Sequence, residues 1–542
     1  MSAAARARRL DETAEIIVFE KGRHVSFANC GLPYFIGGKI KDRSQLLVQT
    51  PERLRRRYGL DVRTEHEVIG FNRSVKKVTV KDLREDRVYT ETYDKLLLAP
   101  GANPIRPPIP GVDNPNVFTL RDLEDMDRIR AAAETVAPSD ERPTGGHAVI
   151  VGGGYIGLEM AENLADRGLR VTVAEMLPQA MPPLDPEMAG PVHEHLREKG
   201  VRLMLGNAVV GIDGTDHLLE VTLQDGASME CDFAILSVGV RPNTELAQQA
   251  GITVGKTGGI AVDEHMRTSD PDVYAVGDAV EMTHLVTGRK VLMPLAGPAN
   301  RQGRVAADNM CGRSSTFGPV QGTAVVKVFE LTAAVTGANE KMLREEGIPA
   351  EKIYVHPRNH VGYYPGGALM ALKLLFSPDD GKILGGQVVG RRGVAKRIDV
   401  LATAMRAGMT VFDLEELELA YAPPYGAAKD PVNMAGFVAS NVLRGDVDLV
   451  HVPDLTEDDW VLDVRTAAEA EEEPVPGAVN IPMGELRDRM AEVPRDRRVP
   501  VFCAVGLRAY NACRALRQRG VQAYLVPGGY RTFRAFRPEG DD

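Results

Sequence analysis

The sequence predicts an α/β protein of about four domains, and three observations lead to this prediction. The chain has 542 residues, and at roughly 150 residues per domain this length suggests three to four domains. Glycine supplies 54 of these residues, about 10% against a usual ~7%, which indicates many tight turns. The third observation is the order strand, glycine-rich turn, helix, strand over residues 147–175.

The composition excludes several broad classes of protein. With 44% hydrophobic and 26% charged residues the chain is an ordinary globular one. No apolar run is long enough for a transmembrane helix, and the Arg-rich start lacks the apolar segment of a secretory signal. The net charge of −10 argues against nucleic-acid or membrane-surface binding. Only five cysteines occur, without a CxxC pair, so we expect a reducing cytoplasm, no disulfide scaffold and no structural zinc site.

The glycine-rich turn has the pattern of a dinucleotide-binding site. An apolar strand at 148–151 leads into a GxGxxG motif formed by Gly152, Gly154 and Gly157, and a helix is expected over 158–167. In this pattern the first glycine permits the turn, and the second lets a pyrophosphate approach the backbone. The third packs the helix on the strand, and the helix N-terminus faces the phosphates.

The strand after this helix indicates which nucleotide is bound. Residues 170–175 read RVTVAE and end in Glu175, where an acid would accept a hydrogen bond from the ribose 2′-hydroxyl of NADH. No arginine follows closely that would pair with a 2′-phosphate. We therefore expect NADH to be favoured over NADPH.

Four further apolar segments predict a second nucleotide-binding domain. Each runs into a glycine turn or an acid; they are residues 16–20, 95–103, 233–243 and 272–278. The first ends in Glu20, and the last ends in Gly-Asp at Asp278. Taken singly, each segment predicts only a buried strand followed by a turn.

Taken together and in this order, the segments resemble the flavoprotein disulfide reductase family. The resemblance implies two Rossmann-like domains, one for FAD and one for NAD(P)H. It assigns Asp278 to the ribityl or phosphate region of FAD and Glu20 to its adenosine ribose. The run 293–304, MPLAGPANRQGR, would abut the flavin ring. The other candidate cofactor contacts are Lys21, Ala99, Gly101, Gly239, Leu295, Ala296 and Asn300.

One departure from the family pattern concerns the start of the chain. In the family a strand and a GxGxxG motif precede the helix that leads into the 16–20 strand, whereas this sequence begins inside that helix. About a dozen residues would be missing, through a mis-set start or a truncated form. A real truncation would remove the helix N-terminus at the FAD pyrophosphate and the central strand of the sheet, so FAD affinity and folding would suffer.

Cys30 is the candidate redox centre. It lies in SFANCGLPY, residues 26–34, after a strand and a turn and at the expected start of a helix, where a thiol is biased toward thiolate. A glutathione-reductase dithiol would need a second cysteine at Phe35, and a CxxC pair would need one at Pro33. Cys30 therefore lacks a local resolving partner, so it must react with a small thiol, a persulfide, or oxygen through a sulfenate.

The segment around Cys30 resembles coenzyme A disulfide reductases and the related persulfide reductases. In those enzymes the lone cysteine forms a mixed disulfide with coenzyme A, and the resemblance implies coenzyme A contacts from Arg6, Arg9, Ser26 and Asn29. Arg6 and Arg9 are three residues apart and share a helix face, which suits the phosphates of coenzyme A. A solvated basic face would also explain the two arginines.

Residues 314–442 match the dimerisation domain of the same family, so a homodimer is expected. In the family this domain offers tyrosines to the active site of the partner subunit. The matching residues are Tyr363, in HPRNHVGYYPGG, and Tyr421 and Tyr425, in AYAPPYGAAKDPVN. A phenol there can give a proton to a departing thiolate; packing at the interface is the alternative role for each.

The C-terminal region, 450–542, resembles a rhodanese domain. Four residues separate Cys503 from Arg508, in the loop CAVGLR, whose backbone N–H groups would surround the sulfur and stabilise a thiolate or persulfide. Related cysteine phosphatases have one residue more, so the loop favours sulfur transfer. Cys231, Cys311 and Cys513 are expected to be packed thiols.

These observations give a working hypothesis and two alternatives. The expected domains are FAD-binding (1–110 and 230–313), NAD(P)H-binding (111–229), dimerisation (314–442) and rhodanese-like (450–542). The hypothesis is an FAD-dependent NAD(P)H oxidoreductase that reduces coenzyme A disulfide, or coenzyme A per- or polysulfides, through Cys30. Cys503 would carry sulfane sulfur, and the fusion favours persulfides. The alternatives are an NADH oxidase using a Cys30 sulfenate, and a sulfur carrier whose flavin domain is redox-silent.

Overall fold

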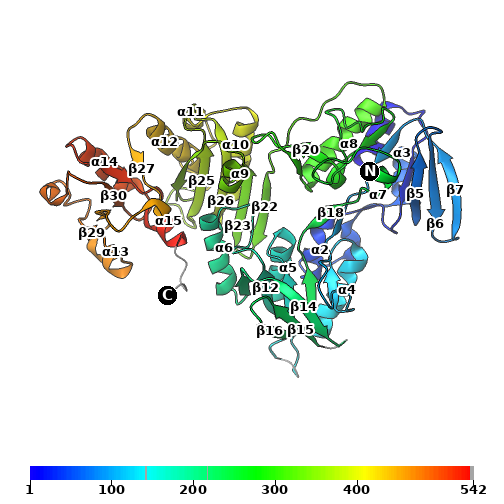
Figure 1. Ribbon diagram of the computed structural model, residues 1–542, viewed down its shortest axis with the longest axis horizontal. Helices are drawn as coiled ribbons and strands as arrows, with labels where there is room; N and C mark the ends of the chain where they lie inside the picture. The colour runs from blue at the N-terminus through cyan, green and yellow to red at the C-terminus, as the bar shows by residue number, and fades with distance from the viewer. Residues whose placement is uncertain (141–142, 216–217, 537–542) are drawn as a thin grey trace. The chain divides into compact units, whose positions relative to one another are not determined.

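The computed structural model describes residues 1–140, 143–215 and 218–536 (Figure 1). The chain divides into two compact units. The first comprises Met1–Ala180 and Lys199–Gly322, and the second comprises Met181–Glu198 and Thr323–Asp542. Within the described ranges, no helix has both the length and the apolar character needed to cross a membrane.

A five-stranded parallel sheet forms the centre of the dinucleotide domain in the first unit. Its strand order is β10 (Val117–Thr119), β17 (Phe233–Leu236), β11 (His147–Val151), β12 (Arg170–Glu175) and β13 (Arg202–Leu205). Every residue of β11 is buried, as expected for the middle of a parallel sheet covered on both faces. The helix that connects β11 to β12 is α5 (Tyr155–Ala165), which begins three residues earlier than the sequence predicts because Gly154 already serves as its N-cap.

The boundary expected at residues 229/230 falls inside this domain. Strand β17 is hydrogen-bonded to β11 in parallel register, with Ile150 opposite Ile235. The segment 233–236 therefore completes the sheet of the domain that contains the glycine-rich turn, although the expected boundary assigns it to the FAD-binding domain. A three-stranded antiparallel sheet of β14 (Val209–Gly214), β15 (Leu219–Leu223) and β16 (Ser228–Cys231) precedes it.

The other half of the first unit contains two separate pairs of parallel strands. Strand β1 (Ile17–Glu20) pairs with β4 (Asp61–Thr64), and β8 (Leu96–Leu98) pairs with β19 (Val273–Ala275). Helix α1 (Ser2–Leu10) packs on α8 (Ala296–Met310).

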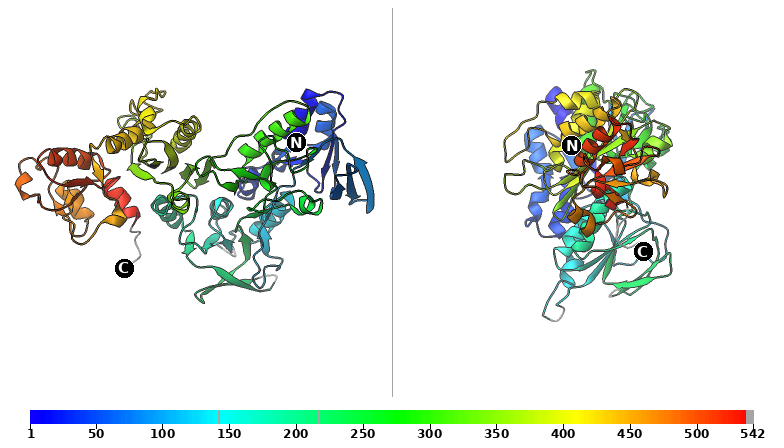
Figure 2. Two further views of the ribbon diagram at one scale, coloured as in Figure 1. Left: turned by 45° about the horizontal axis from the view of Figure 1, so that its top comes forward. Right: turned by 90° about the vertical axis from the view of Figure 1, so that its left-hand side faces the viewer.

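An antiparallel sheet of three strands accompanies these pairs. Strands β5 (His66–Asn72), β6 (Lys77–Asp82) and β7 (Arg87–Thr92) lie side by side at the blue end of the chain in Figure 2.

The second unit contains two sheets of five strands each. The antiparallel sheet comprises β22 (Ala324–Val328), β23 (Leu331–Gly337), β26 (Ile383–Gly390), β25 (Met370–Phe376) and β24 (Glu351–Val355), in that order. Helices α6 (Pro186–Glu198) and α10 (Val394–Arg406) pack on it, and α12 (Pro431–Leu443) contacts β24 and β25.

The second of these sheets is parallel and forms the C-terminal domain (orange and red in Figure 1). Its strands are β27 (Asp448–Leu449), β31 (Ala523–Leu525), β30 (Val499–Phe502), β28 (Leu462–Asp463) and β29 (Val479–Asn480), in that order. The helices of this domain are α13 (Ala467–Glu472), α14 (Leu507–Arg517) and α15 (Gly529–Ala535). The last residues of the expected rhodanese-like region, 537–542, lie outside the described ranges.

A buried charge cluster joins α6 to the antiparallel sheet. Lys373, in β25, is fully buried and forms ion pairs with Asp185, Glu187 and Glu340. Burial alone would raise the pKa of Glu340, but Lys373 and Lys352 lower it to about 2. Burial prevails at Asp185, whose pKa is raised. The three carboxylates lie close enough together to suggest a metal site, but the ammonium group of Lys373 already forms an ion pair with each of them.

Replacing this lysine is expected to destabilise the second unit. In the Lys373→Met variant the buried carboxylates lose their main counter-charge, and removing one partner of a buried ion pair costs about 3–5 kcal/mol. Urea unfolding measures the loss, with Lys341→Met, an exposed lysine on the neighbouring helix, as control. A loss below about 1 kcal/mol, the range of ordinary surface changes, would contradict the role of the cluster.

Candidate functional site

The glycine-rich turn after β11 leaves room for a nucleotide phosphate only because three residues lack side chains. A Cβ on Gly157 would lie 2.0 Å from the carbonyl oxygen of Gly152, so the helix could not approach the strand as it does. A Cβ on Gly154 would meet nothing within 4 Å, so this side of the turn is open. Gly154 supplies no side-chain cap, so the first turn of α5 presents backbone N–H groups to that space. The site fits a pyrophosphate.

Glu175 lies beside this turn, at the carboxyl end of β12. Its Oε2 accepts a hydrogen bond from the backbone N–H of Gly153 (2.7 Å), and its Oε1 accepts one from Leu177 (2.8 Å). Both bonds hold the carboxylate at the edge of the glycine turn. This is the position from which an acid receives the ribose hydroxyls of a bound dinucleotide.

The two acids assigned to FAD also lie at strand ends. Glu20 ends β1 and accepts a hydrogen bond from the N–H of Gly22 (2.6 Å). Asp278 lies in a 3-10 turn that follows β19, and burial raises its pKa. Lys21 pairs with Glu67 on the surface, so its charge is already compensated.

The remaining residues assigned to this site surround two turns and a helix start. Ala99 and Gly101 follow β8, and strand β9 (Ala102–Pro104) then pairs with β18 (Val240–Pro242), which follows Gly239. These two turns therefore lie next to each other. Leu295 is the N-cap of α8 and gives no side-chain cap, Ala296 begins the helix, and the Asn300 amide donates to the Ala296 carbonyl. An uncapped helix start suits an acceptor group of a flavin-type cofactor.

Cys30 is exposed and lies in a short 3-10 turn, Asn29–Gly31. Strand β2 (Ser26–Phe27) precedes the turn, and helix α2 (Leu32–Ile36) follows it. The sequence predicts a helix starting at Cys30; the structure has this turn first and a helix of only five residues. The thiol is thus accessible to a small reactant from solvent.

Helix α2 packs against α5, a contact that was not predicted from the sequence. The hydroxyl of Tyr34, four residues after Cys30, donates to Glu159 Oε1 (3.2 Å), and burial raises the pKa of both groups. Arg167 Nη1 also donates to the carbonyl of Ile36 (2.6 Å). The helix that presents its N-terminus to the dinucleotide therefore supports the segment that carries Cys30. The signal in the sequence was the acid Glu159, near the start of the helix expected over 158–167.

The arginines assigned to coenzyme A differ in their surroundings. Arg6 is largely buried, and its Nε forms an ion pair with Asp308 Oδ1 of α8 (2.7 Å). Arg9 is exposed. Of the two, only Arg9 has a side chain open to solvent for a phosphate group.

The three assigned tyrosines are exposed at the surface of the second unit. Tyr363, Tyr421 and Tyr425 have relative exposures of 76%, 45% and 73%. The hydroxyls of Tyr363 and Tyr421 are 3.1 Å apart and share a hydrogen bond, which raises the pKa of Tyr421. The structure thus joins two of the three tyrosines, each from a different motif.

Cys503 lies at the end of β30, beneath a tight backbone loop. The N–H of Gly506, whose φ of +103° favours glycine, donates to the Cys503 sulfur (3.0 Å). Helix α14 begins at Leu507, so Arg508 belongs to the first turn of this helix. The loop itself is therefore residues 503–506, with the helix start completing the enclosure of the sulfur.

The other three cysteines have no comparable surroundings. Cys231 and Cys513 are buried and Cys311 is half-buried. Burial raises the pKa of Cys231 to about 12, and it raises those of Cys513 and Cys311 as well. All three thiols are held in the protonated, unreactive form.

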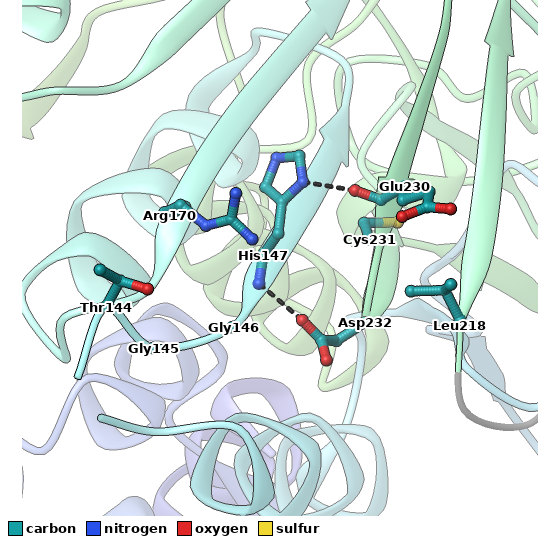
Figure 3. A pocket seen from close by; sticks show the side chains of 9 residues that line it. All are labelled: Thr144, Gly145, Gly146, His147, Arg170, Leu218, Glu230, Cys231 and Asp232. Carbon is teal, nitrogen blue, oxygen red and sulfur yellow. Dashed lines mark hydrogen bonds between the residues drawn. The ribbon is translucent and has the colours of Figure 1, made fainter. Parts of the chain in front are cut away.

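Cys231 borders a cavity of about 270 Å³ at the amino ends of β11 and β12 (Figure 3). His147 lies in its wall, with Nδ1 bonded to the Glu230 carbonyl (2.6 Å) and Nε2 to Thr172 Oγ1 (2.9 Å). Because nucleotides bind at the carboxyl ends of such strands, the cavity lies at the edge opposite the glycine turn. Its histidine has a structural role.

The geometry defines a class of protein. One domain is built around a dinucleotide-binding turn, the same unit contains two further pairs of parallel strands, and an exposed cysteine follows strands β1 and β2. The C-terminal domain contains the loop 503–506, which encloses the sulfur of Cys503. Together these features define a nucleotide-dependent oxidoreductase with an attached sulfur-handling domain.

Comparison with known families agrees with this class. Residues 1–303 match the model of the pyridine nucleotide-disulphide oxidoreductases, 323–430 match the dimerisation domain of that family, and 451–536 match the rhodanese-like domain. The chain belongs to the pyridine nucleotide-disulphide oxidoreductase family and is an oxidoreductase.

Individual relatives extend this comparison. The chain is 36% identical over 436 residues to an NADH oxidase of Methanocaldococcus jannaschii, covering 80% of this chain and 95% of that protein. It is 35% identical over 442 residues to a coenzyme A disulfide reductase of Staphylococcus haemolyticus, covering 81% and 96%.

Two solved structures match almost the whole chain. Reduced CoADR-RHD of Bacillus anthracis has a TM-score of 0.96 at 46% identity, covering 99% of this chain and 96% of that one. The NAD-dependent persulfide reductase of A. fulgidus has a TM-score of 0.91 at 39% identity, covering 98% and 97%.

The position of Glu175 predicts how the enzyme discriminates between nucleotides. In Glu175→Ala the ribose of NADH loses a charged acceptor, a loss of roughly 1.5–3 kcal/mol, so we expect the KM for NADH to rise about 10- to 100-fold. The KM for NADPH should rise less, because its 2′-phosphate gains nothing from a carboxylate. Steady-state kinetics with both nucleotides measure the difference.

Glu230→Ala provides the matched control for this prediction. Its side chain is exposed at the opposite edge of the same domain, so the variant changes the net charge equally. Equal effects of the two variants on NADH would contradict the assignment of Glu175.

Proposed function

We propose that the enzyme reduces coenzyme A disulfide, or coenzyme A per- and polysulfides, with electrons from NAD(P)H. FAD would accept hydride from the nicotinamide and pass two electrons to a disulfide at Cys30. The observation that carries the proposal is the exposed Cys30 without a neighbouring cysteine, since such a thiol must take its partner sulfur from a substrate. The names of the coenzyme A disulfide reductase and persulfide reductase relatives support it.

The chemistry at Cys30 is thiol–disulfide exchange. The Cys30 thiolate attacks one sulfur of the coenzyme A disulfide, a new S–S bond forms to Cys30, and a coenzyme A thiolate leaves and takes up a proton. Two electrons, which originate from NAD(P)H and would pass through FAD, then cleave the mixed disulfide; this restores the Cys30 thiolate and releases the second coenzyme A as a thiolate, which takes up a proton. A phenol close to the leaving sulfur lowers the cost of its negative charge.

Coenzyme A would be held near Cys30 by Ser26, Asn29 and Arg9. Arg6 would contribute only by giving up its ion pair with Asp308. The phosphates of coenzyme A pair well with guanidinium groups, so Arg9 is the residue whose replacement should affect coenzyme A binding most.

The C-terminal domain would supply or remove sulfane sulfur at Cys503. The loop around Cys503 stabilises a persulfide through backbone N–H groups, and its fusion to a thiol-reducing enzyme favours per- and polysulfides as physiological substrates. We further propose a homodimer that works in the cytoplasm. Tyr363, Tyr421 and Tyr425 would reach the Cys30 site of the partner subunit.

The NADH oxidase relative keeps oxygen reduction as a second candidate. There Cys30 would cycle through a sulfenate, which needs no coenzyme A and no sulfur-holding domain. Oxygen consumption with NADH alone, at a rate matching disulfide or persulfide reduction, would favour this candidate.

Replacing Cys30 tests the proposal directly. In Cys30→Ser the NADH-dependent reduction of coenzyme A disulfide and coenzyme A persulfide should fall by at least about 10³-fold, since the covalent intermediate is lost. NADH consumption followed by absorbance gives the rate, and Cys311→Ser, a half-buried thiol, should retain full activity. Full reductase activity of the Cys30→Ser variant would refute the proposal.

Subunit mixing tests whether the tyrosines serve the partner. Tyr421→Phe alone should lower kcat by about 10²-fold, the usual contribution of a positioned proton donor. If the tyrosines act across the dimer, a mixed dimer of Cys30→Ser and Tyr421→Phe subunits has one complete site and regains about half of the wild-type rate per dimer. If they act within one subunit, neither site is complete and activity stays low.

A further inference from the structure

An ion pair stands at the loop that holds Cys503. Arg508 Nη1 lies 2.7 Å from Glu469 Oε2, and Arg508 Nη2 lies 2.8 Å from Glu469 Oε1. The two side chains thus meet in the planar, two-bonded arrangement that is the strongest form of such a pair. About a third of each side chain is exposed, 34% for Arg508 and 39% for Glu469, so the pair borders the solvent side of the domain.

Glu469 is fixed in this position by its own helix. It is the third residue of α13, and its Oε2 accepts hydrogen bonds from both the N–H and the hydroxyl of Thr466, 2.9 Å each, which forms a capping box. The hydrogen bond from Arg508 is the main reason that the pKa of Glu469 falls to about 2. The carboxylate is therefore ionised at any working pH.

Arg508 is the cation closest in sequence to Cys503. It lies in the first turn of α14, and its guanidinium also interacts with the cysteine sulfur, a secondary cause of the raised pKa of Arg508. Unpaired, it would add one positive charge beside the sulfur. Paired with Glu469, it contributes a dipole with no net charge.

Two other arginines near the loop keep the same surroundings when the charge of Arg508 changes. Arg465 is buried and paired with Asp463 at 2.7 Å. Arg531 donates its backbone N–H to the Ala504 carbonyl, and its guanidinium feels the charges of Arg534 and Arg358 as well as that of Glu473. Arg531 therefore keeps a positive charge, which is the same in the wild type and in the variants compared below.

These charges matter because sulfane-sulfur donors differ in charge. Thiosulfate is a dianion, and its transfer releases the sulfite dianion. A thiol persulfide is neutral or singly charged at the reacting sulfurs. A loop at which the charge of Arg508 is neutralised offers a dianion less long-range attraction, but it can still hold a persulfide through backbone N–H groups.

We propose that Glu469 determines the donor specificity of Cys503: by neutralising Arg508 it makes the domain accept sulfur from thiol persulfides in preference to thiosulfate. The inference rests on the proposed role of Cys503 as sulfur carrier. In the transfer, the Cys503 thiolate attacks the outer sulfur of RS–SH. A bond from the Cys503 sulfur to that sulfur forms, the RS–S bond breaks, and RS⁻ leaves while the proton stays on the new persulfide. Sulfur is transferred without net oxidation or reduction.

The test compares two donors on the full-length enzyme. Sulfur transfer to cyanide is measured with thiosulfate and with 2-mercaptoethanol persulfide, which carries no charge outside its sulfurs, for the wild type and for Glu469→Gln. Gln can keep the capping box while freeing the charge of Arg508. We expect the wild type to prefer the persulfide at least about tenfold in kcat/KM, and Glu469→Gln to raise kcat/KM for thiosulfate about tenfold. The value for the persulfide should change less than about threefold.

Matched variants separate the charge effect from other causes. Glu471→Gln, on the same helix but away from Arg508, should leave both donors unaffected. Arg508→Met alone leaves Glu469 as an uncompensated anion beside the loop and should lower kcat/KM for thiosulfate. Adding Glu469→Gln in that background should restore only the wild-type value, because the pair is again without net charge. The thiosulfate gain of Glu469→Gln should also shrink as ionic strength rises.

Two outcomes would overturn the inference: a wild type that uses thiosulfate as well as the persulfide, or a Glu469→Gln variant with an unchanged donor ratio. If Glu469→Gln fails to fold, Arg508→Met decides alone: it leaves Glu469 uncompensated, so it should lower kcat/KM for thiosulfate more than for the persulfide, and an unchanged donor ratio would overturn the inference. The Cys503→Ser variant distinguishes failure of the inference about Glu469 from failure of the proposed function of Cys503. If transfer from both donors survives that variant, Cys503 is not the carrier, whatever Glu469 does.

Discussion

The close approach of α5 to the turn after β11 is the constraint on which the nucleotide site and its surroundings depend. A side chain on Gly157 would strike the Gly152 carbonyl, so only this glycine lets the helix point its N-terminus at a phosphate. The same helix then supports α2 through the hydrogen bond of Tyr34 to Glu159. The packing of α5 against the turn after β11 thus determines both the position of the dinucleotide site and the support of the segment that carries Cys30.

The sequence predicts the parts that are local along the chain. The GxGxxG turn and the acid at the end of β12 follow from a fixed spacing, because strand, turn and helix are consecutive. The surroundings of Arg6 and Glu469 could not be predicted, since Asp308 and Arg508 pair with them from distant segments. The place of β17 in the sheet was missed for the same reason: a strand's neighbours depend on tertiary pairing, and its own apolar run is equally compatible with either dinucleotide domain.

The two sulfur-bearing sites differ in how they expose their thiol. Cys30 lies on a short turn and is open to solvent, as suits exchange with a substrate that arrives and leaves as a thiol. Cys503 is buried, with the Gly506 N–H on its sulfur, as suits a persulfide that must be kept from unwanted thiols. The exposure of Cys30 fits the repeated exchange proposed for it, and the enclosure of Cys503 fits the proposed storage of sulfane sulfur.

Charge compensation links these sites to substrate choice. The chain carries a net charge of −10, and two arginines assigned to the sulfur chemistry are already paired: Arg6 with Asp308 and Arg508 with Glu469. An anion that relies on charge alone, such as an inorganic oxyanion, finds little attraction there. A ligand such as coenzyme A can place its phosphates at a more distant cation and bring only its thiol or persulfide to the cysteine. These paired arginines agree with the proposed preference for sulfur carried on an organic thiol over sulfur carried on an inorganic anion.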